Sequence, residues 1–155
     1  MSNPARYSFV STDSSLGEAS FKPLLPLTFN YKEKSQEVIG LLDTGAMVNV
    51  LPYQIGVELG AVWEEQTIML QLSGNLAQFE ARVLILSATV GQLSSVRLVF
   101  AWAQANQIPV LLGQVNFFME FDICFYRSQK IFEVTPKKIK ETSCIIYHSL
   151  LIPNS

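Results

Sequence analysis

The sequence predicts an all-β domain that folds into a small closed or partly closed barrel with one or two short helices. The chain has 155 residues, of which 49% are hydrophobic, and this is enough for one domain with a real core. Short apolar runs recur along the chain, and turn residues separate them at intervals of about 8 to 12 residues, a spacing typical of barrels. We find no internal repeat in the sequence.

The first strands are expected after a polar leader. Residues 1–20 are rich in Ser, Thr, Asp and Gly and show little periodicity, which indicates a flexible leader. Pro23 precedes the β-prone run 24–29 and Pro26 interrupts it, which favours an edge strand or the start of a strand. The polar residues 30–37 predict a hairpin loop. The apolar run Val38–Leu42 then predicts a short strand that is buried on both faces.

The middle of the chain predicts a helix and a hairpin. Pro52 begins a candidate short helix over Tyr53–Leu59, and Gly60 ends it. Residues 67–72 and 76–86 look like the two arms of a hairpin whose turn is Ser73-Gly74-Asn75. Further along, strands are expected over residues 96–102, 108–112 and 131–134, with a strongly aromatic segment over 117–125.

Composition argues against several classes of partner. Only 15% of residues are charged and the formal net charge is −2, so the chain has no electrostatic reason to bind nucleic acid or an anionic membrane. No apolar stretch approaches the roughly 18 residues of a membrane-spanning helix, and the N-terminus lacks the pattern of a signal peptide.

Two cysteines, Cys124 and Cys144, are neither a disulfide framework nor a zinc site. Cysteines without a structural role are typical of proteins in a reducing compartment, so we expect a cytoplasmic protein. We expect no metal and no other cofactor. The lysine run at 137, 138 and 140 is typical of a solvated tail, and residues 136–155 are predicted to be a C-terminal extension.

The strongest chemical signal is the segment Leu41-Leu42-Asp43-Thr44-Gly45-Ala46. A bare Asp-Thr-Gly arises by chance in roughly a few per cent of chains of this length. The two apolar residues before it and the small residue after it lower that chance by about two orders of magnitude. An alternative interpretation is a plain turn after a strand, because Asp, Thr and Gly all favour turns.

This segment resembles the active-site motif of the retropepsin-like aspartic peptidases, which are the retroviral proteases and their small cellular and bacterial relatives. Asn49-Val50-Leu51-Pro52 is similar to a run found in many non-viral members. Val110-Leu111-Leu112-Gly113 resembles the second signature of the family, an apolar pair before a glycine. The resemblance extends over about residues 21–134, so we expect one peptidase domain over residues 21–135.

The resemblance implies an aspartic endopeptidase that acts as a homodimer on a peptide or protein substrate. In such an enzyme two aspartates share one proton and activate a water, with no metal and no covalent intermediate. This chain has one such motif. Asp13 and Asp122 lack the following Thr/Ser-Gly, and Asp122 is expected at the surface of a strand. The second carboxylate would therefore be Asp43 of another copy.

The resemblance also assigns roles to the residues around Asp43. Thr44 would tie the two active-site loops together across the two-fold axis. Gly45 would allow close backbone approach and offer an amide to a carboxylate, and Ala46 would relieve crowding. Gly113, after Leu112, would let the second loop pack beneath the catalytic strand. A flap would close over the substrate and exclude water, formed by Leu72, Ser73, Gly74, Asn75 and Leu76.

Some positions depart from the viral pattern. Met47 and Val48 stand where the viral enzymes usually carry acidic residues, and Gln114 stands where they often carry arginine. Dimer contacts are therefore expected to be more apolar than in the viral enzymes. Apolar residues near the motif predict a preference for hydrophobic side chains around the scissile bond, among them Val50, Leu72, Leu76 and Leu112.

Rival functions remain open to different degrees. A non-catalytic peptide-binding or dimerisation module on the same fold is the main alternative, although the intact Asp43-Thr44-Gly45 favours an enzyme. Serine or cysteine hydrolysis would depend on His148, the one histidine, and the chain has no Gly-x-Ser-x-Gly elbow. No glycine-rich phosphate loop is present.

Overall fold

A computed structural model describes residues 3–138 of the chain. The apolar part of the predicted C-terminal extension, Cys144 and His148 lie outside the described residues. Within residues 3–138, no helix is long and apolar enough to cross a membrane.

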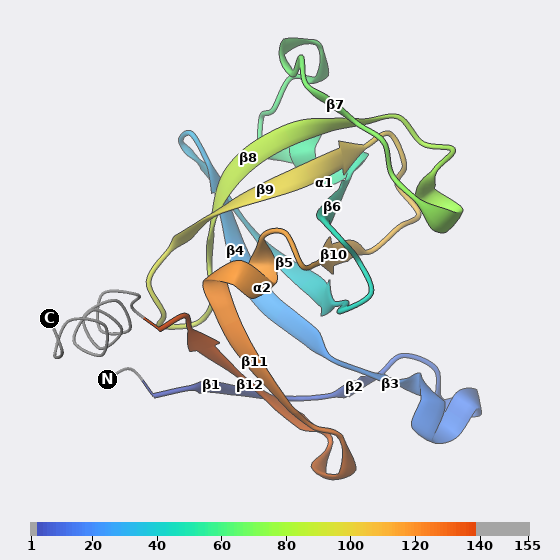
Figure 1. Ribbon diagram of the computed structural model, residues 1–155, viewed down its shortest axis with the longest axis vertical. Coiled ribbons are helices and arrows are strands. Elements are labelled where there is room, and N and C mark those ends of the chain that lie inside the picture. Colours follow the sequence, from blue (N-terminus) through green and yellow to red (C-terminus); the bar gives the residue numbers. More distant parts are fainter. Residues whose placement is uncertain (1–2, 139–155) are drawn as a thin grey trace, which may run out of the picture.

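The centre of the structure is a closed β-barrel (Figure 1). Neighbouring strands pair around the barrel in an order that differs from their order in the chain, and β8 returns to pair with β4 through Thr28↔Thr89 and Asn30↔Ser87. The all-β closed barrel predicted from the sequence is therefore confirmed. Around the barrel the strands are β4 (Leu24–Tyr31), β5 (Lys34–Leu42), β10 (Val110–Leu112), β6 (Asn49–Pro52), β9 (Val96–Ala103) and β8 (Ala81–Thr89).

The place of β10 in the barrel decides the geometry of the predicted motif. Although β5 and β6 follow each other in the chain, β10 lies between them, parallel to β5 and antiparallel to β6. Leu112 of β10 pairs with Leu42 of β5, so the two strands end together. The loops that follow them, residues 43–48 and 113–116, therefore leave the barrel side by side.

A second sheet lies below the barrel in the view of Figure 1 and contains both ends of the described chain. Its strand order is β1 (Ala5–Ser8), β12 (Ile131–Pro136) and β11 (Phe121–Tyr126). A small ribbon of β2 (Val10–Ser11) and β3 (Phe21–Lys22) continues from it, with the 3₁₀ helix η1 (Ser14–Ser20) between the two strands.

The prediction of a flexible leader over residues 1–20 is wrong where β1 and η1 form. The ring of Tyr7 stacks on Phe132 with centroids 5.5 Å apart, and Phe9 is buried. The Glu18 carboxylate lies 2.9 Å from the Lys130 ammonium, whose hydrogen bond lowers the pKa of that carboxyl. These partners lie more than 100 residues away in the chain, so the local composition gave no sign of them.

Several elements differ in extent from their predictions. Only Lys32 and Glu33 separate β4 from β5, because the polar residues 34–37 continue the strand instead of forming a loop. Ile39 of β5 is 55% exposed, so the run Val38–Leu42 is not buried on both faces. The predicted helix is present as α1 (Tyr53–Glu58), and the aromatic segment forms α2 (Phe117–Glu120) and then β11. Asp122 is exposed on β11, as predicted.

The remaining elements are short. Strand β7 (Met69–Leu70) pairs with the start of β8, and three further 3₁₀ turns complete the fold. These turns are η2 (Trp63–Glu65), η3 (Gly74–Leu76) and η4 (Arg127–Gln129).

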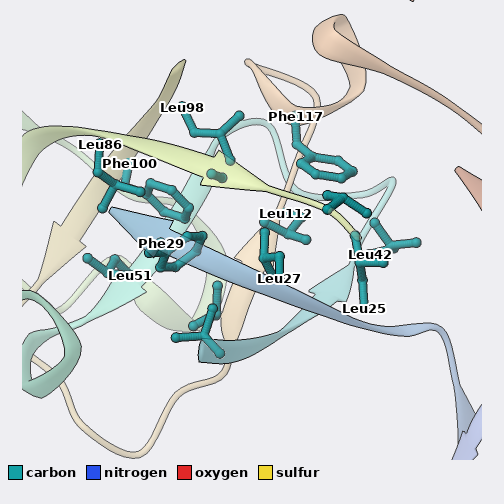
Figure 2. Packing of buried hydrophobic residues seen from close by; sticks show 14 of the residues in the cluster. Leu25, Leu27, Phe29, Leu42, Leu51, Leu86, Leu98, Phe100, Leu112 and Phe117 are labelled. Atoms are coloured by element: carbon teal, nitrogen blue, oxygen red, sulfur yellow. The ribbon is translucent and has the colours of Figure 1, made fainter. Parts of the chain in front are cut away.

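The main core fills the barrel with aliphatic and aromatic side chains that point toward one another from facing strands (Figure 2). Leu25 and Phe29 of β4 and Phe100 of β9 are fully buried. Each such side chain contributes roughly 1.5–3 kcal/mol to stability. Leu42 and Leu112 belong to the same core and directly precede the two loops, so the core fixes where both loops begin.

Deleting residues 1–8 should destabilise the domain, because it removes β1 and the Tyr7 ring from Phe132. We expect a loss of about 2 kcal/mol or more in the free energy of unfolding, measured by urea denaturation. A chain that begins at residue 4 keeps β1 and serves as the control. If both truncations unfold at the same urea concentration, residues 5–8 are a leader after all.

Candidate active site

Asp43 lies in the turn that directly follows β5. Its backbone N–H donates to the Leu112 carbonyl over 3.0 Å, and its carbonyl accepts from the Ala46 N–H over 3.1 Å. The Gly45 N–H donates to Asp43 Oδ1 over 3.0 Å. Backbone bonds therefore fix the turn from both sides, and one amide is aimed at the carboxylate. A hydrogen bond in that position restricts the orientation of the carboxylate.

Two glycines allow the close packing of this region. A Cβ at Gly45 would lie 3.3 Å from Asp43 Oδ1, so any side chain there would press on the carboxylate. A Cβ at Gly113 would lie only 2.6 Å from the Val48 carbonyl oxygen and 2.7 Å from that of Ala46. These oxygens belong to the backbone and cannot move aside. The loop after β10 therefore packs directly against the Asp43 loop.

A buried asparagine links the two loops to the barrel. Asn49, at the start of β6, is fully buried, and its Oδ1 accepts from the Gly113 N–H over 2.8 Å. Its Nδ2 donates to the Val99 carbonyl and to Asn116 Oδ1. Asn116 Oδ1 accepts in turn from the Val99 N–H over 2.9 Å. The network satisfies polar groups in an otherwise apolar region, which is what makes a buried amide tolerable.

Sequence reasoning missed this network. In the sequence, Asn49 stands out only as part of a run similar to that of non-viral retropepsin-like peptidases, and Asn116 carries no signal of a role. The available signal was an asparagine inside the short apolar segment around Val50, since an unpaired amide there would be costly. Its partners could not be predicted, because Val99 and Asn116 are distant in the chain and lie beside Asn49 only once the strands have paired.

A cleft of about 320 Å³ opens beside Asp43. The Asp43 loop forms one wall and the predicted flap forms the other. Among the described residues that line the cleft, Asp43 is the one ionisable group. The lining consists of Asp43, Gly45, Ala46, Met47, Val48, Val50, Gln71, Leu72, Ser73, Gly74, Leu76 and Leu111.

The cleft therefore brings most of the predicted site residues together, with four exceptions. Gly113 is buried behind the Asp43 loop and does not line the cleft. Thr44 and Asn75 are exposed and do not line it. Leu112 is fully buried and points into the barrel core, so Leu111 rather than Leu112 faces the cleft.

A larger hollow of about 640 Å³ lies against the outer face of β4 and β5. Pro26, Val38 and Ile39 line it together with Tyr7 and Glu37. It contains no residue of the Asp43 loop and no set of polar groups that converge on one point. We therefore take the smaller cleft as the candidate active site.

The flap differs in detail from the predicted hairpin. Only Met69 and Leu70 form its first strand, and residues 71–80 make a long tip that contains η3 instead of a tight turn. Gly74 adopts a left-handed conformation with φ of 61°. The Gln71 side-chain amide closes the tip by donating to the Leu72 and Ala77 carbonyls, over 3.0 and 3.1 Å.

The flap also packs onto its own barrel. Leu72 is buried in a second apolar cluster with Val50 and Ala101, and Leu76 packs against that cluster. A single chain therefore already holds the segment 71–76 against the barrel, at the same cleft as the Asp43 loop. In residues 3–138 no three His, Cys, Asp or Glu side chains are placed to hold a metal ion.

Comparisons with known proteins agree with this geometry at the level of the fold. The sequence matches no protein-family model and no curated protein. Among solved structures, a retropepsin-like aspartic protease from Rickettsia conorii is similar with a TM-score of 0.61 and 12% identity, over 85% of this chain and 91% of that one. EIAV protease complexed with an inhibitor is similar with a TM-score of 0.43 and 21% identity, over 60% and 82% of the two chains. The chain therefore has a retropepsin-like fold, as its motifs predicted.

Replacing Asn49 by leucine should destabilise the domain. The variant keeps the side-chain volume but leaves the buried Gly113 N–H without a partner, which costs about 1–3 kcal/mol. Urea denaturation measures the loss. Asn106 is the matched control, because its side chain accepts a bond from the Gln54 N–H at an exposed position. Equal losses for Asn49→Leu and Asn106→Leu would contradict the role of the buried network.

Proposed function

We propose that this protein is an aspartic endopeptidase that acts as a homodimer, with Asp43 of each chain as the catalytic residue. One observation carries the proposal: an intact Asp-Thr-Gly turn presents a partly exposed carboxylate, held by the Gly45 amide, at the wall of a cleft under a flap. The retropepsin-like fold supports it, since the similar structure from Rickettsia conorii is that of a retropepsin-like aspartic protease.

The proposed mechanism is general acid–base catalysis by two carboxyl groups. Two Asp43 side chains held close together share one proton, because both cannot be ionised at that distance. The ionised group takes a proton from a water lying between them, and the resulting hydroxide attacks the peptide carbonyl. The protonated group donates a hydrogen bond to the carbonyl oxygen as that oxygen gains negative charge. The carboxyl group that took the proton from the water then gives it to the nitrogen of the leaving amine, and the peptide C–N bond breaks.

The surface around Asp43 supports pairing with a second copy. Met47 is 66% exposed and Val115 is 47% exposed, and the two residues are neighbours because the Val115 N–H donates to the Met47 carbonyl over 2.8 Å. Segments 43–48 and 111–119 contain no charged residue except Asp43. In a two-fold symmetric contact each residue near the axis meets its own copy, so a surface without like charges can pair with itself. The apolar dimer contacts expected from the sequence are part of this proposal.

The cleft favours an extended peptide with apolar side chains near the scissile bond. Val50, Leu72, Leu76 and Leu111 supply apolar walls, while Gln71 and Ser73 can offer polar groups from the flap. Thr44 is exposed at the turn, where it could meet its counterpart across the two-fold axis. A cytoplasmic location remains a prediction that rests on the cysteine usage of the sequence.

Peptide-library cleavage between about pH 4 and 7 tests the proposal. We expect the wild type to cut peptides at apolar positions and Asp43→Asn to lose at least about 1,000-fold in kcat/KM, because the shared proton and the base are both lost. Asp122→Asn, which changes an exposed aspartate on β11, is the control and should retain activity. If the wild type and Asp43→Asn both form dimers and are equally inert, the chain is a binding or dimerisation module.

A further inference from the structure

We propose that Gln114 is a positioning residue that orients the Asp43 carboxylate through a single peptide group. The inference rests on the proposed function for its kinetic consequences, although the coupling itself can be measured without catalysis. Gln114 does not line the cleft, so we do not expect it to contact a substrate bound in the cleft of its own chain.

The two ends of the Thr44–Gly45 peptide group carry the argument. Gln114 Nε2 donates to the Thr44 carbonyl oxygen over 2.7 Å. The N–H of the same peptide group, which belongs to Gly45, donates to Asp43 Oδ1 over 3.0 Å. The side chain of Gln114 is therefore joined to the carboxylate by two hydrogen bonds in series, with one planar peptide group between them.

This arrangement acts on Asp43 in two ways. Because the peptide group is planar, holding its oxygen fixes the direction in which its N–H points. A hydrogen bond to the carbonyl also polarises the peptide group, which makes its N–H a stronger donor. Both effects strengthen the bond to the ionised carboxylate and hold the side chain in one orientation.

The bond from Gln114 is not needed to keep the two loops together. Backbone bonds already join them, from the Asp43 N–H to the Leu112 carbonyl and from the Gln114 N–H to the Ala46 carbonyl. A further backbone bond runs from the Val115 N–H to the Met47 carbonyl. Among the described contacts, the Gln114 side chain adds a bond specifically to the peptide group that faces the carboxylate.

The test compares Gln114→Met, which keeps the length of the side chain and removes its donor, with the wild type. Gln66→Met is the matched control, since Gln66 Nε2 also donates to a backbone carbonyl, that of Val62, on an exposed surface. The first readout is the amide proton resonance of Gly45, followed by NMR through a pH titration. We expect this resonance to move upfield in Gln114→Met, because the Gly45 N–H then makes a weaker hydrogen bond to Asp43 Oδ1. In Gln66→Met it should not change.

The second readout is kinetic and uses protein concentrations at which the chain is fully dimeric. We expect kcat in Gln114→Met to fall about fivefold with KM nearly unchanged, the size expected for one net hydrogen bond.

A third variant guards against a folding defect and provides a rescue. In Gln114→Glu the new carboxyl group can donate to the Thr44 carbonyl only when it is protonated. The Gly45 resonance should therefore lie close to that of the wild type at the same pH when the pH is below about 4, and upfield of it at higher pH.

The inference would be overturned if the Gly45 amide proton resonance in folded Gln114→Met and Gln114→Glu equals that of the wild type at every pH. If the NMR changes appear while the wild type cuts no peptide, the coupling holds and the proposed peptidase function fails.

Discussion

The candidate site depends on one topological constraint, which is that β10 lies between β5 and β6. Because Leu42 and Leu112 end their strands in the same core, the turn at Asp43 and the turn at Gly113 emerge in contact. Gly113 has no room for a side chain against the backbone of the Asp43 loop, and its N–H is satisfied by the buried Asn49. The position of the carboxylate is thus set by backbone and core packing before any functional side chain contributes.

Within the described cleft, the groups that face Asp43 are dipoles and not charges. The Gly45 amide faces the carboxylate, and Gln114 holds the other end of the same peptide group. Met47 and Val115 occupy the adjoining surface, where acidic or basic residues would add a charge to each copy of the chain. Among the described residues that line the cleft, the carboxylate of Asp43 is therefore the one charged group.

The sequence predicted the barrel and the motif well because both depend on local patterns. The apolar run before Asp43 and the Thr-Gly after it identify the turn, and the glycine after Leu112 identifies its companion. Features that depend on distant partners were not predictable. The β1 strand has its contacts on β12, and the Asn49 amide has its partners on β9 and after β10. The partner of the Gln114 side chain is the Thr44 carbonyl, which lies 70 residues earlier in the chain. Residues 71–80, which include the predicted flap tip, contain η3 instead of a tight turn, and the Gln71 side chain donates there to the Leu72 and Ala77 carbonyls.

The claim that one active site needs Asp43 from two chains is tested most directly by subunit mixing. Wild-type chains are equilibrated with Asp43→Asn chains at constant total concentration, and peptide cleavage is measured as the wild-type share falls. If pairing is random and both carboxylates are needed, activity follows the square of the wild-type share, so an equal mixture retains about a quarter of the activity. Activity that falls only in proportion to the wild-type share, to about half in the equal mixture, would show that each chain acts alone and would contradict the account.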